Sequence, residues 1–242
     1  PGTSNTVTGL YEAQYGSSRV LVITGQAETA FYGKGLAYVH EAEQQVPMLA
    51  SVCRRVESPR APSQLGPALQ AVLTEMYTGR GAPGALEIPI DIQYAENASV
   101  EISLPGNDQF APDEKKLDLV IDALQQSQRR ILLVGGGVIA AGAHAHVQAL
   151  AEQLQIPVLT TVDGRGALPE DHPLCIGNYY NSAGMYQAIA DADLTLAIGT
   201  KFAVGVDGQF AAQTPPGKLV QIDIDGNMVG RTHHAHIGLV AD

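Results

Sequence analysis

The stretch RILLVGGG, residues 130–137, decides the fold of this 242-residue chain. Its unbroken apolar run from Ile131 to Val134 is typical of a parallel strand that is buried on both faces, and it leads directly into three glycines. Glycines at this place let the backbone turn tightly and approach a neighbouring group closely. The segment that follows is rich in alanine and histidine and predicts a helix. We therefore expect a strand–loop–helix unit of the nucleotide-binding type, placed in the middle of the chain.

Strand and helix patterns alternate around this unit along residues 113–242. The predicted elements are helices at 117–126, 141–154 and 186–192, and strands at 131–134, 158–161, 194–199 and 218–224. Strands that alternate with helices in sequence form a parallel sheet between two layers of helices. This part of the chain is therefore predicted to be a Rossmann-like, doubly wound α/β domain.

The first part of the chain shows the same alternation with fewer strands. Its predicted elements are strands at 19–25 and 85–92, and helices that begin near residue 3, around 40–51 and at 68–77. Only two or three strands fit before residue 95, whereas a typical sheet has about 5–6. We expect residues 1–96 to be part of a doubly wound parallel domain, joined to the domain at 113–242 by the polar linker 97–112.

Composition and charge exclude several classes of function. Hydrophobic residues make up 45% of the chain and charged residues 16%, which supports a buried core and argues against disorder. The net charge is -11, with 14 dispersed lysines and arginines, so nucleic acid is not an expected partner. No apolar run approaches the ~20 residues of a membrane span, and no charged-then-apolar leader stands at the start. We expect a cytoplasmic protein without a membrane partner.

Six segments occur in an order that resembles one enzyme family. They are GQ (25–26) after RVLVIT, TGRGAPGALEIPIDIQ (78–93), RRILLVGGGVIAAGA (129–143), IPVLTTVDGRGALPEDHPLCIGN (156–178), ADLTLAIGTKF (193–202) and VQIDID (220–225). Together they resemble the thiamine diphosphate-dependent enzymes of the acetolactate synthase and benzoylformate decarboxylase family. The opening PGTSN (1–5) resembles the end of that family's GPGxxN segment, which begins a helix beside the cofactor pyrimidine. The resemblance covers essentially the whole chain.

This resemblance implies both a domain division and an activity. Residues 1–96 would be the later part of a pyrimidine-binding domain, and residues 113–242 most of a central domain. The complete enzyme would use thiamine diphosphate and Mg2+ to act on a 2-oxo acid as a lyase or transferase, releasing CO2 and passing the carbanion to a proton or an acceptor. Family members hold the cofactor between subunits, so a homodimer or homotetramer is implied. The identity of the 2-oxo acid stays open.

Two parts of the family's machinery do not stand in this sequence. One is the glutamate upstream of GPGxxN that protonates the pyrimidine ring, and the other is the GDG…N segment that holds magnesium and diphosphate. Asp207-Gly208 and Asp225-Gly226 do not stand in a GDG that is followed about 25 residues later by asparagine. The chain is therefore expected to be a fragment that is inactive alone, or a relative that has lost catalysis.

Four candidate site residues lie in the first domain. Gly2 and Asn5 would lie beside the pyrimidine because of their place in PGTSN, although helix capping alone explains such residues. Gln26 belongs to the GQ segment. His40 falls where relatives often carry Gln-Glu after an aromatic residue, and an imidazole there could exchange a proton near the substrate. The alternative is that His40 is an ordinary packed or surface histidine.

The glycine triplet of the second domain is the candidate nucleotide site. Backbone N–H groups of Gly135, Gly136 and Gly137 could bind a diphosphate, and relatives use this domain for FAD or the ADP part of coenzyme A. By the same resemblance Gly199 and Thr200, which follow a parallel strand, belong to this candidate site.

Acidic residues at the end of the 218–224 strand extend the candidate site. Asp223 and Asp225 sit where carboxylates often accept ribose hydroxyls, with capping of the strand end as the equal alternative.

The same segments also contain departures from nucleotide-binding patterns. The spacing of the glycines is not GxGxxG, and residues 201–205 replace the Arg-Phe-Asp-Asp-Arg type run of the flavin-binding relatives. Lysine does not reproduce the paired phosphate contacts of the lost arginines. We therefore disfavour FAD and favour a scaffold without a nucleotide. The rival hypothesis is a non-catalytic module that binds ADP, FAD or coenzyme A.

The remaining polar candidates are given structural roles. Glu87 and Asp91, in and at the end of a predicted strand, are expected to make structural hydrogen bonds. His233, His234 and His236 lack cysteine or carboxylate partners at metal-ligand spacing, so a solvated polar turn is expected there. No metal-binding residue is predicted.

Overall fold

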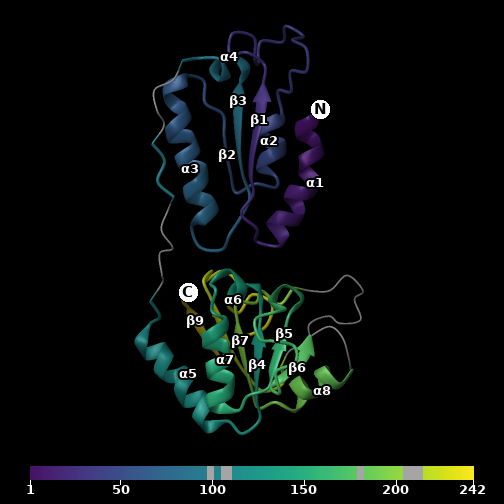
Figure 1. The fold of residues 1–242 in the computed structure, drawn as a ribbon, viewed down its shortest axis with the longest axis vertical. Helices are drawn as coiled ribbons and strands as arrows, with labels where there is room; N and C mark the ends of the chain where they lie inside the picture. The colour runs from purple at the N-terminus through teal and green to yellow at the C-terminus, as the bar shows by residue number, and fades with distance from the viewer. Residues whose placement is uncertain (97–100, 105–110, 179–182, 204–214) are drawn as a thin grey trace. The chain divides into compact units, whose positions relative to one another are not determined.

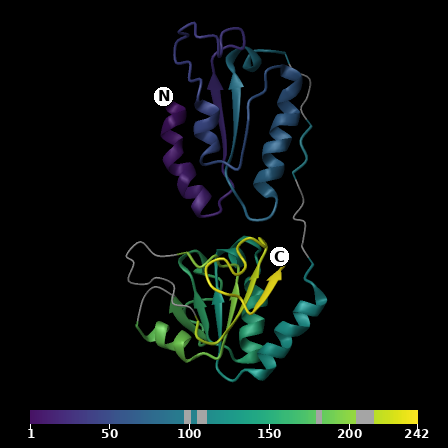
Figure 2. The same cartoon turned by 180° about the vertical axis from the view of Figure 1, so that it is seen from behind.

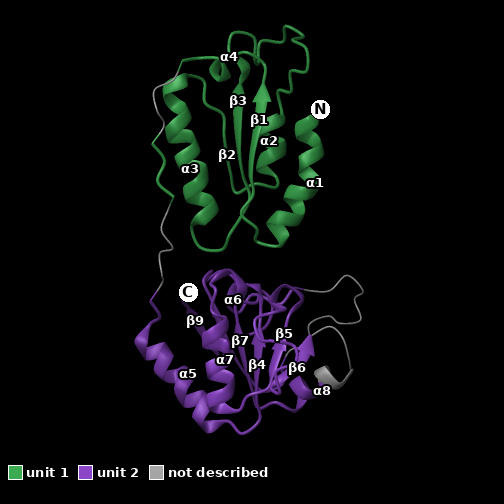
Figure 3. Ribbon diagram, in the orientation of Figure 1, with its two compact units in different colours: residues 1–108 green, residues 109–242 purple. Residues whose placement is uncertain are grey.

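The computed structural model describes residues 1–96, 101–104, 111–178, 183–203 and 215–242. They form two compact units, residues 1–108 and 109–242 (Figure 3). The division falls within the polar segment 97–112, of which residues 97–100 and 105–110 lie outside the described residues. Each unit contains a parallel sheet flanked by helices, so the predicted α/β class is confirmed.

Unit 1 has a three-stranded parallel sheet in the order β1–β3–β2. Its elements are α1 (Gly2–Tyr15), β1 (Leu21–Gln26), α2 (Gln45–Ala50), β2 (Arg55–Glu57), η1 (Pro62–Gln64), α3 (Leu65–Tyr77), β3 (Gly84–Pro89) and α4 (Ile90–Gln93). Ala85 of β3 packs with Leu10 of α1 and Leu49 of α2. On the other face, Gly84 leaves room for Val72 and Met76 of α3. The two helix layers are seen on either side of the sheet in Figures 1 and 2.

Two predicted boundaries in unit 1 are wrong. The helix expected around 40–51 begins only at Gln45, because His40 has a left-handed backbone with φ of 61° that cannot continue a right-handed helix. The strand expected at 85–92 ends at Pro89, after which α4 forms one helical turn. His40 therefore lies in a loop, which we call the His40 loop (residues 27–44), and Asp91 lies in α4.

Unit 2 has a six-stranded parallel sheet in the order β6–β5–β4–β7–β8–β9 (Figure 1). Its elements are α5 (Glu114–Gln126), β4 (Arg130–Val134), α6 (Gly136–Ala140), α7 (His144–Leu154), β5 (Val158–Thr160), η2 (Val162–Gly164), β6 (Cys175–Asn178), α8 (Ala183–Asp191), β7 (Leu194–Ile198), β8 (Lys218–Asp223) and β9 (Ile237–Val240). If the six strands β4 to β9 are renumbered 1 to 6 in chain order, their order in the sheet is 3-2-1-4-5-6, which is the order of dinucleotide-binding folds. The Rossmann-like prediction is confirmed. RILLV forms β4, which is the first strand of this sheet in chain order and one of its two central strands.

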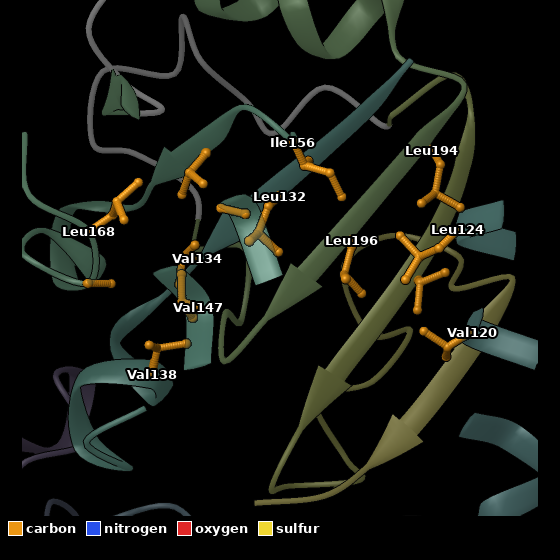
Figure 4. Close-up of a cluster of buried hydrophobic side chains, with 14 of the residues drawn as sticks. Val120, Leu124, Leu132, Val134, Val138, Val147, Ile156, Leu168, Leu194 and Leu196 are labelled. Carbon is orange, nitrogen blue, oxygen red and sulfur yellow. The ribbon is translucent and has the colours of Figure 1, made fainter. Parts of the chain in front are cut away.

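The strand β4 is buried on both faces, as its unbroken apolar run predicts. Leu132 and Val134 pack in the cluster that includes Val120 and Leu124 of α5 and Val147 of α7 (Figure 4). Ile131 and Leu133 point to the opposite face, in the cluster that includes Ile189 of α8. Both alternating sets of side chains are therefore buried, which explains why the run is apolar without a break.

Across the residues that the structure describes, no helix has both the length and the apolar character needed to cross a lipid bilayer.

Candidate functional site

A pocket of about 480 Å³ lies along β1 and its carboxyl end in unit 1. Its wall combines the start of α1, the strand β1, the tip of the His40 loop at 38–40, and one residue each from α2 and α4, Gln45 and Ile90. The carboxyl ends of parallel strands are where ligands bind in α/β folds. The pocket therefore lies where the fold favours a site.

Three of the four residues predicted for the first domain line this pocket. They are Gly2 at the start of α1, Gln26 at the end of β1, and His40 in the loop. Asn5 is exposed on α1 and does not line it. The helix-cap alternative for the opening residues is not seen either, because α1 begins at Gly2 with Pro1 at its cap and without a side-chain cap.

The His40 loop is held by contacts on both sides of the pocket-lining tip. The Thr29 backbone N–H and hydroxyl both donate to the Asp91 carboxylate, and the hydroxyl hydrogen bond lowers the pKa of Asp91. The Gly33 N–H donates to Glu41 Oε1 at 2.6 Å. The two bonds from Thr29 confirm the structural hydrogen bonds expected of Asp91. Its expected place at a strand end is wrong, because it lies in α4.

Below the pocket lies a carboxylate that is fully buried, Glu87 of β3. It accepts hydrogen bonds from Gln45 Nε2 at 2.8 Å, Ser58 Oγ at 2.7 Å and Gln26 Nε2 at 3.1 Å. The expectation of structural hydrogen bonds at Glu87 is confirmed. Sequence reasoning missed that two of its partners, Gln26 and Gln45, line the pocket; the available signal was a charged residue inside the apolar run ALEIP (85–89).

The polar atoms of Gln26 are largely engaged with the protein. Its Nε2 donates to the Ala42 carbonyl oxygen at 3.1 Å as well as to Glu87, and its Oε1 accepts from the Ala27 N–H at 2.8 Å. Gln26 thus faces the pocket with an amide whose orientation is fixed from behind.

In unit 2 the predicted glycines come together as a close backbone contact. The Gly135 N–H donates to the Ile198 carbonyl oxygen at 2.8 Å, and the Gly137 N–H donates to that of Gly199 at 3.0 Å. A Cβ on Gly135 would stand 2.2 Å from the Gly199 oxygen. Thr200 is buried beside them, and its hydroxyl oxygen accepts from the Phe202 N–H at 3.2 Å. Two N–H groups of the turn are therefore used to join β4 to β7.

The two aspartates at the end of β8 make local capping bonds. Asp223 is buried, and its Oδ1 accepts from the Asp225 N–H at 3.0 Å. Asp225 Oδ1 in turn accepts from the backbone and side-chain nitrogens of Asn227 at 2.9 and 3.0 Å. This geometry matches the capping alternative.

One histidine of the expected polar turn is not solvated. His233 is 6% exposed and meets the Phe202 ring edge-on at a centroid distance of 4.9 Å, and burial lowers the pKa of His233. His234 and His236 are exposed, as expected. In the described ranges, no group of three or more His, Cys, Asp or Glu residues is arranged to hold a metal ion.

Known proteins match the chain over both units. Residues 117–242 match the family model described as thiamine pyrophosphate enzyme, central domain. The chain is 30% identical to a probable acetolactate synthase large subunit of Methanocaldococcus jannaschii, over 100% of this chain and 42% of that protein. It is 31% identical to a probable 2-ketoarginine decarboxylase of Pseudomonas aeruginosa, over 100% of this chain and 43% of that protein.

A solved structure shows the same fold over the whole chain. It is an X-ray structure of a protein from Mycobacterium smegmatis assigned as a thiamin diphosphate-dependent enzyme, with a TM-score of 0.81 and 22% identity. The match covers 100% of this chain and 47% of that one. This chain therefore spans less than half the length of each of these relatives.

Proposed function

Because this chain belongs to the thiamine pyrophosphate enzymes of the acetolactate synthase family, we propose that it is part of an enzyme that carboligates or decarboxylates 2-oxo acids. Relatives named as acetolactate synthase, 2-ketoarginine decarboxylase and glyoxylate carboligase support this proposal. The observation that carries it is the pocket of unit 1, where Gly2, Gln26 and His40 meet from three separate segments.

The pocket fits the pyrimidine ring of thiamine diphosphate and not its diphosphate. Its lining holds aliphatic side chains such as Val22 and Ile90 and hydroxyls such as Thr3, and no Asp, Glu, Lys or Arg of the described part of the chain lines it. An uncharged wall of this kind suits a flat heteroaromatic ring. A divalent cation needs several hard oxygen ligands, and the described residues offer no acidic cluster for one.

We therefore assign only the ring-binding role to this chain. Gly2, Thr3, Gln26 and Ile90 would hold the ring, while magnesium and the diphosphate would be held by other parts of the complete protein. When bound, the cofactor supplies a nucleophilic carbon and an electron sink for the 2-oxo acid. Asn5, being outside the pocket, is not assigned to the cofactor.

His40 is proposed to hold and move a proton beside the reacting carbonyl. Its left-handed backbone lies in the pocket wall, with Tyr38 and Val39 next to it. An imidazole can accept or donate a proton near neutral pH, which suits proton transfer to or from the substrate. Tyr38 stacks on Phe31 at a centroid distance of 5.3 Å, and this contact stabilises the loop beside His40.

Unit 2 is proposed to be a scaffold without a bound nucleotide. The N–H groups of Gly135 and Gly137 bond to protein carbonyls, and Asp223 and Asp225 accept local backbone bonds. These contacts support a structural role over the rival nucleotide-binding module. A thermal-shift screen with ADP, FAD, NAD and coenzyme A tests it, because a stabilising nucleotide would favour the rival.

The proposal extends to the organisation of the complete protein. Residues 1–96 would belong to a pyrimidine-binding domain and 113–242 to a central domain, joined by the linker 97–112. The complete enzyme would use magnesium, assemble as a homodimer or homotetramer, and work in the cytoplasm. Sedimentation equilibrium with and without thiamine diphosphate tests the assembly.

Titration with the cofactor tests the division of binding between this chain and the rest of the protein. The isolated 242-residue chain should bind thiamine diphosphate with Mg2+ only weakly, since the pocket contributes ring contacts alone. Micromolar affinity of the isolated chain would contradict the assignment of the diphosphate to other segments.

A further inference from the structure

Glu87 is a charged side chain in the centre of an otherwise apolar strand, with 0% of its surface exposed. A buried carboxylate is costly unless donors satisfy it, and here Gln26, Gln45 and Ser58 do so. An apolar residue of similar volume at such a site often leaves a fold equally stable or more stable. Stability alone therefore does not explain a carboxylate at this position, and its role depends on the residues that its hydrogen-bond partners contact.

Both glutamine partners connect Glu87 to the backbone of the pocket wall. Gln26 Nε2 also donates to the carbonyl oxygen of Ala42, which lies two residues beyond His40. That oxygen accepts a second hydrogen bond from the Gln45 N–H at 3.0 Å. Gln45 Nε2 donates to the carbonyl oxygen of Gly25, another pocket residue, at 2.8 Å. Each amide thus bridges the carboxylate and the backbone of the site.

The Glu87 carboxylate accepts from the same amide ends that donate to the carbonyl oxygens of Ala42 and Gly25. An ionised carboxylate only accepts hydrogen bonds, so it selects the NH2 end of Gln26 and of Gln45. The selected orientation leaves Gln26 Oε1 to accept from the Ala27 N–H. A neutral amide at position 87 would have one accepting oxygen in place of two and would hold the NH2 groups of Gln26 and Gln45 less strongly, since hydrogen bonds to a charged acceptor are about twice as strong as neutral ones.

A second contact ties the carboxylate to the start of the same loop. An Arg60 guanidinium nitrogen lies 3.9 Å from Glu87 Oε1, and the Arg60 guanidinium stacks over the ring of Tyr32 at 4.0 Å from its centroid. Tyr32 belongs to the His40 loop. Contacts that lead from Glu87 therefore reach the loop on both sides of its tip.

We infer that Glu87 is the positioning residue of this pocket: through Gln26 and Gln45 it sets the backbone that presents His40. The inference rests on the proposed role of His40 in proton transfer. It concerns no contact between Glu87 and the substrate, since the carboxylate lies behind the pocket wall.

Amide hydrogen exchange in Glu87→Gln tests this inference independently of activity. The Glu41 and Gln45 N–H groups donate to carbonyl oxygens of the His40 loop, those of Tyr38 and Ala42, at 3.0 Å each. Loss of buried hydrogen bonds raises the equilibrium constant for local opening by roughly ten- to hundredfold. We expect exchange of these two amides to accelerate by that factor, while the Arg54 amide, which bonds to Pro83, changes much less.

Ser58→Ala is the matched control. It removes one donor to the same buried carboxylate but does not touch the pocket, and exchange at Glu41 and Gln45 should stay at the wild-type rate. Equal acceleration in both variants would show general loosening and overturn the inference, as would unchanged exchange in Glu87→Gln. If Glu87→Gln does not fold, Gln26→Met removes the bridge from Glu87 to Ala42, together with the Ala27 bond, and leaves the Gln45 bridge in place. Unchanged loop exchange in that variant also overturns the inference.

Kinetics of the complete protein add a readout that a purely structural role would not move. Glu87→Gln should lower kcat for the 2-oxo acid, with KM within about twofold of wild type, and the double variant with His40→Ala should be no slower than His40→Ala alone. If the fold-losses in kcat of the two single variants multiply in the double variant, Glu87 does not act through His40. If the protein shows no cofactor-dependent turnover at all, the proposed function fails, while the exchange experiment still decides the inference.

Discussion

The Gly137 N–H donates a 3.0 Å hydrogen bond to the carbonyl oxygen of Gly199, which joins the turn after β4 to the end of β7. The two backbones lie in direct contact there, with no room for a side chain on Gly137. A Cβ on Gly137 would stand 2.6 Å from the Gly199 Cα, and Gly199 itself has φ of 63°. Gly135, Gly137 and Gly199 are therefore explained by packing between adjacent strand ends.

Gly137→Ala should destabilise unit 2. The added methyl group meets backbone that cannot yield without moving a strand end, and overpacking of this kind costs about 1–3 kcal/mol. Urea unfolding measures the loss. Gly226→Ala is the control, because its Cβ would meet only the tip of the Val240 side chain at 3.3 Å; an equal loss in both variants would contradict the packing explanation.

Leu132→Ala should be among the most damaging core substitutions. Leu132 is fully buried between β4 and the helices α5 and α7 (Figure 4), and truncation of such a leucine costs about 2–5 kcal/mol. Ile139→Ala is the exposed aliphatic control, since 36% of Ile139 is exposed. Thermal unfolding compares the two, and a smaller loss at Leu132 than at Ile139 would show that the core is placed wrongly.

Asp193→Asn should reveal a stabilising charge that fades in acid. Hydrogen bonds from the backbone N–H groups of Gln128 and Arg129, at 3.0 Å each, lower the pKa of the Asp193 carboxyl, the Gln128 bond most. Because the folded-state pKa lies below the unfolded value of about 3.9, the contribution is complete above that value and is lost as the pH falls through the folded pKa.

Urea unfolding of wild type and Asp193→Asn between pH 7 and pH 3 measures this effect. The wild type should be the more stable protein at pH 7, and the gap should narrow toward pH 3. A gap that stays constant over this range would show that the charge of Asp193 contributes nothing to the folded state.

His40→Ala should slow the complete enzyme without unfolding it. General acid–base groups contribute about 10²–10⁴-fold to rate, so kcat should fall by at least about a hundredfold while the thermal midpoint stays near wild type. His146→Ala is the control, because His146 is exposed on α7 of unit 2. Equal rates in wild type and His40→Ala would remove His40 from the proposed mechanism.

The long, regular elements of this fold were predictable from sequence, and the short edge elements were not. RILLV carries a continuous apolar pattern because both faces of β4 are buried. The strands β6 and β9 have four residues each and contain a glycine, so neither shows a period that distinguishes a strand from a turn. The three-residue strand β2, beginning at Arg55, is also too short to show one.

The candidate site was predictable only where a motif marks it. Gly2, Gln26 and His40 were found through their places in family segments, and the pocket brings them together. Asn5 shares a segment with Gly2, but one residue along a helix is a rotation of about 100°, which places it away from Thr6 and the pocket. Gln45 and Ser58 could not be predicted, because their links to Glu87 depend on how α2 and the segment after β2 pack against β3 and not on spacing in sequence.

The most direct test of the central claim is 2-oxo acid consumption by the complete protein that contains these 242 residues, with Mg2+ and with or without thiamine diphosphate. A panel of 2-oxo acids should include pyruvate, glyoxylate and 2-ketoarginine. The account predicts consumption of at least one of them that depends on thiamine diphosphate and falls in His40→Ala. A folded protein that consumes none of them with the cofactor present, and is instead stabilised by ADP, FAD or coenzyme A, would contradict it.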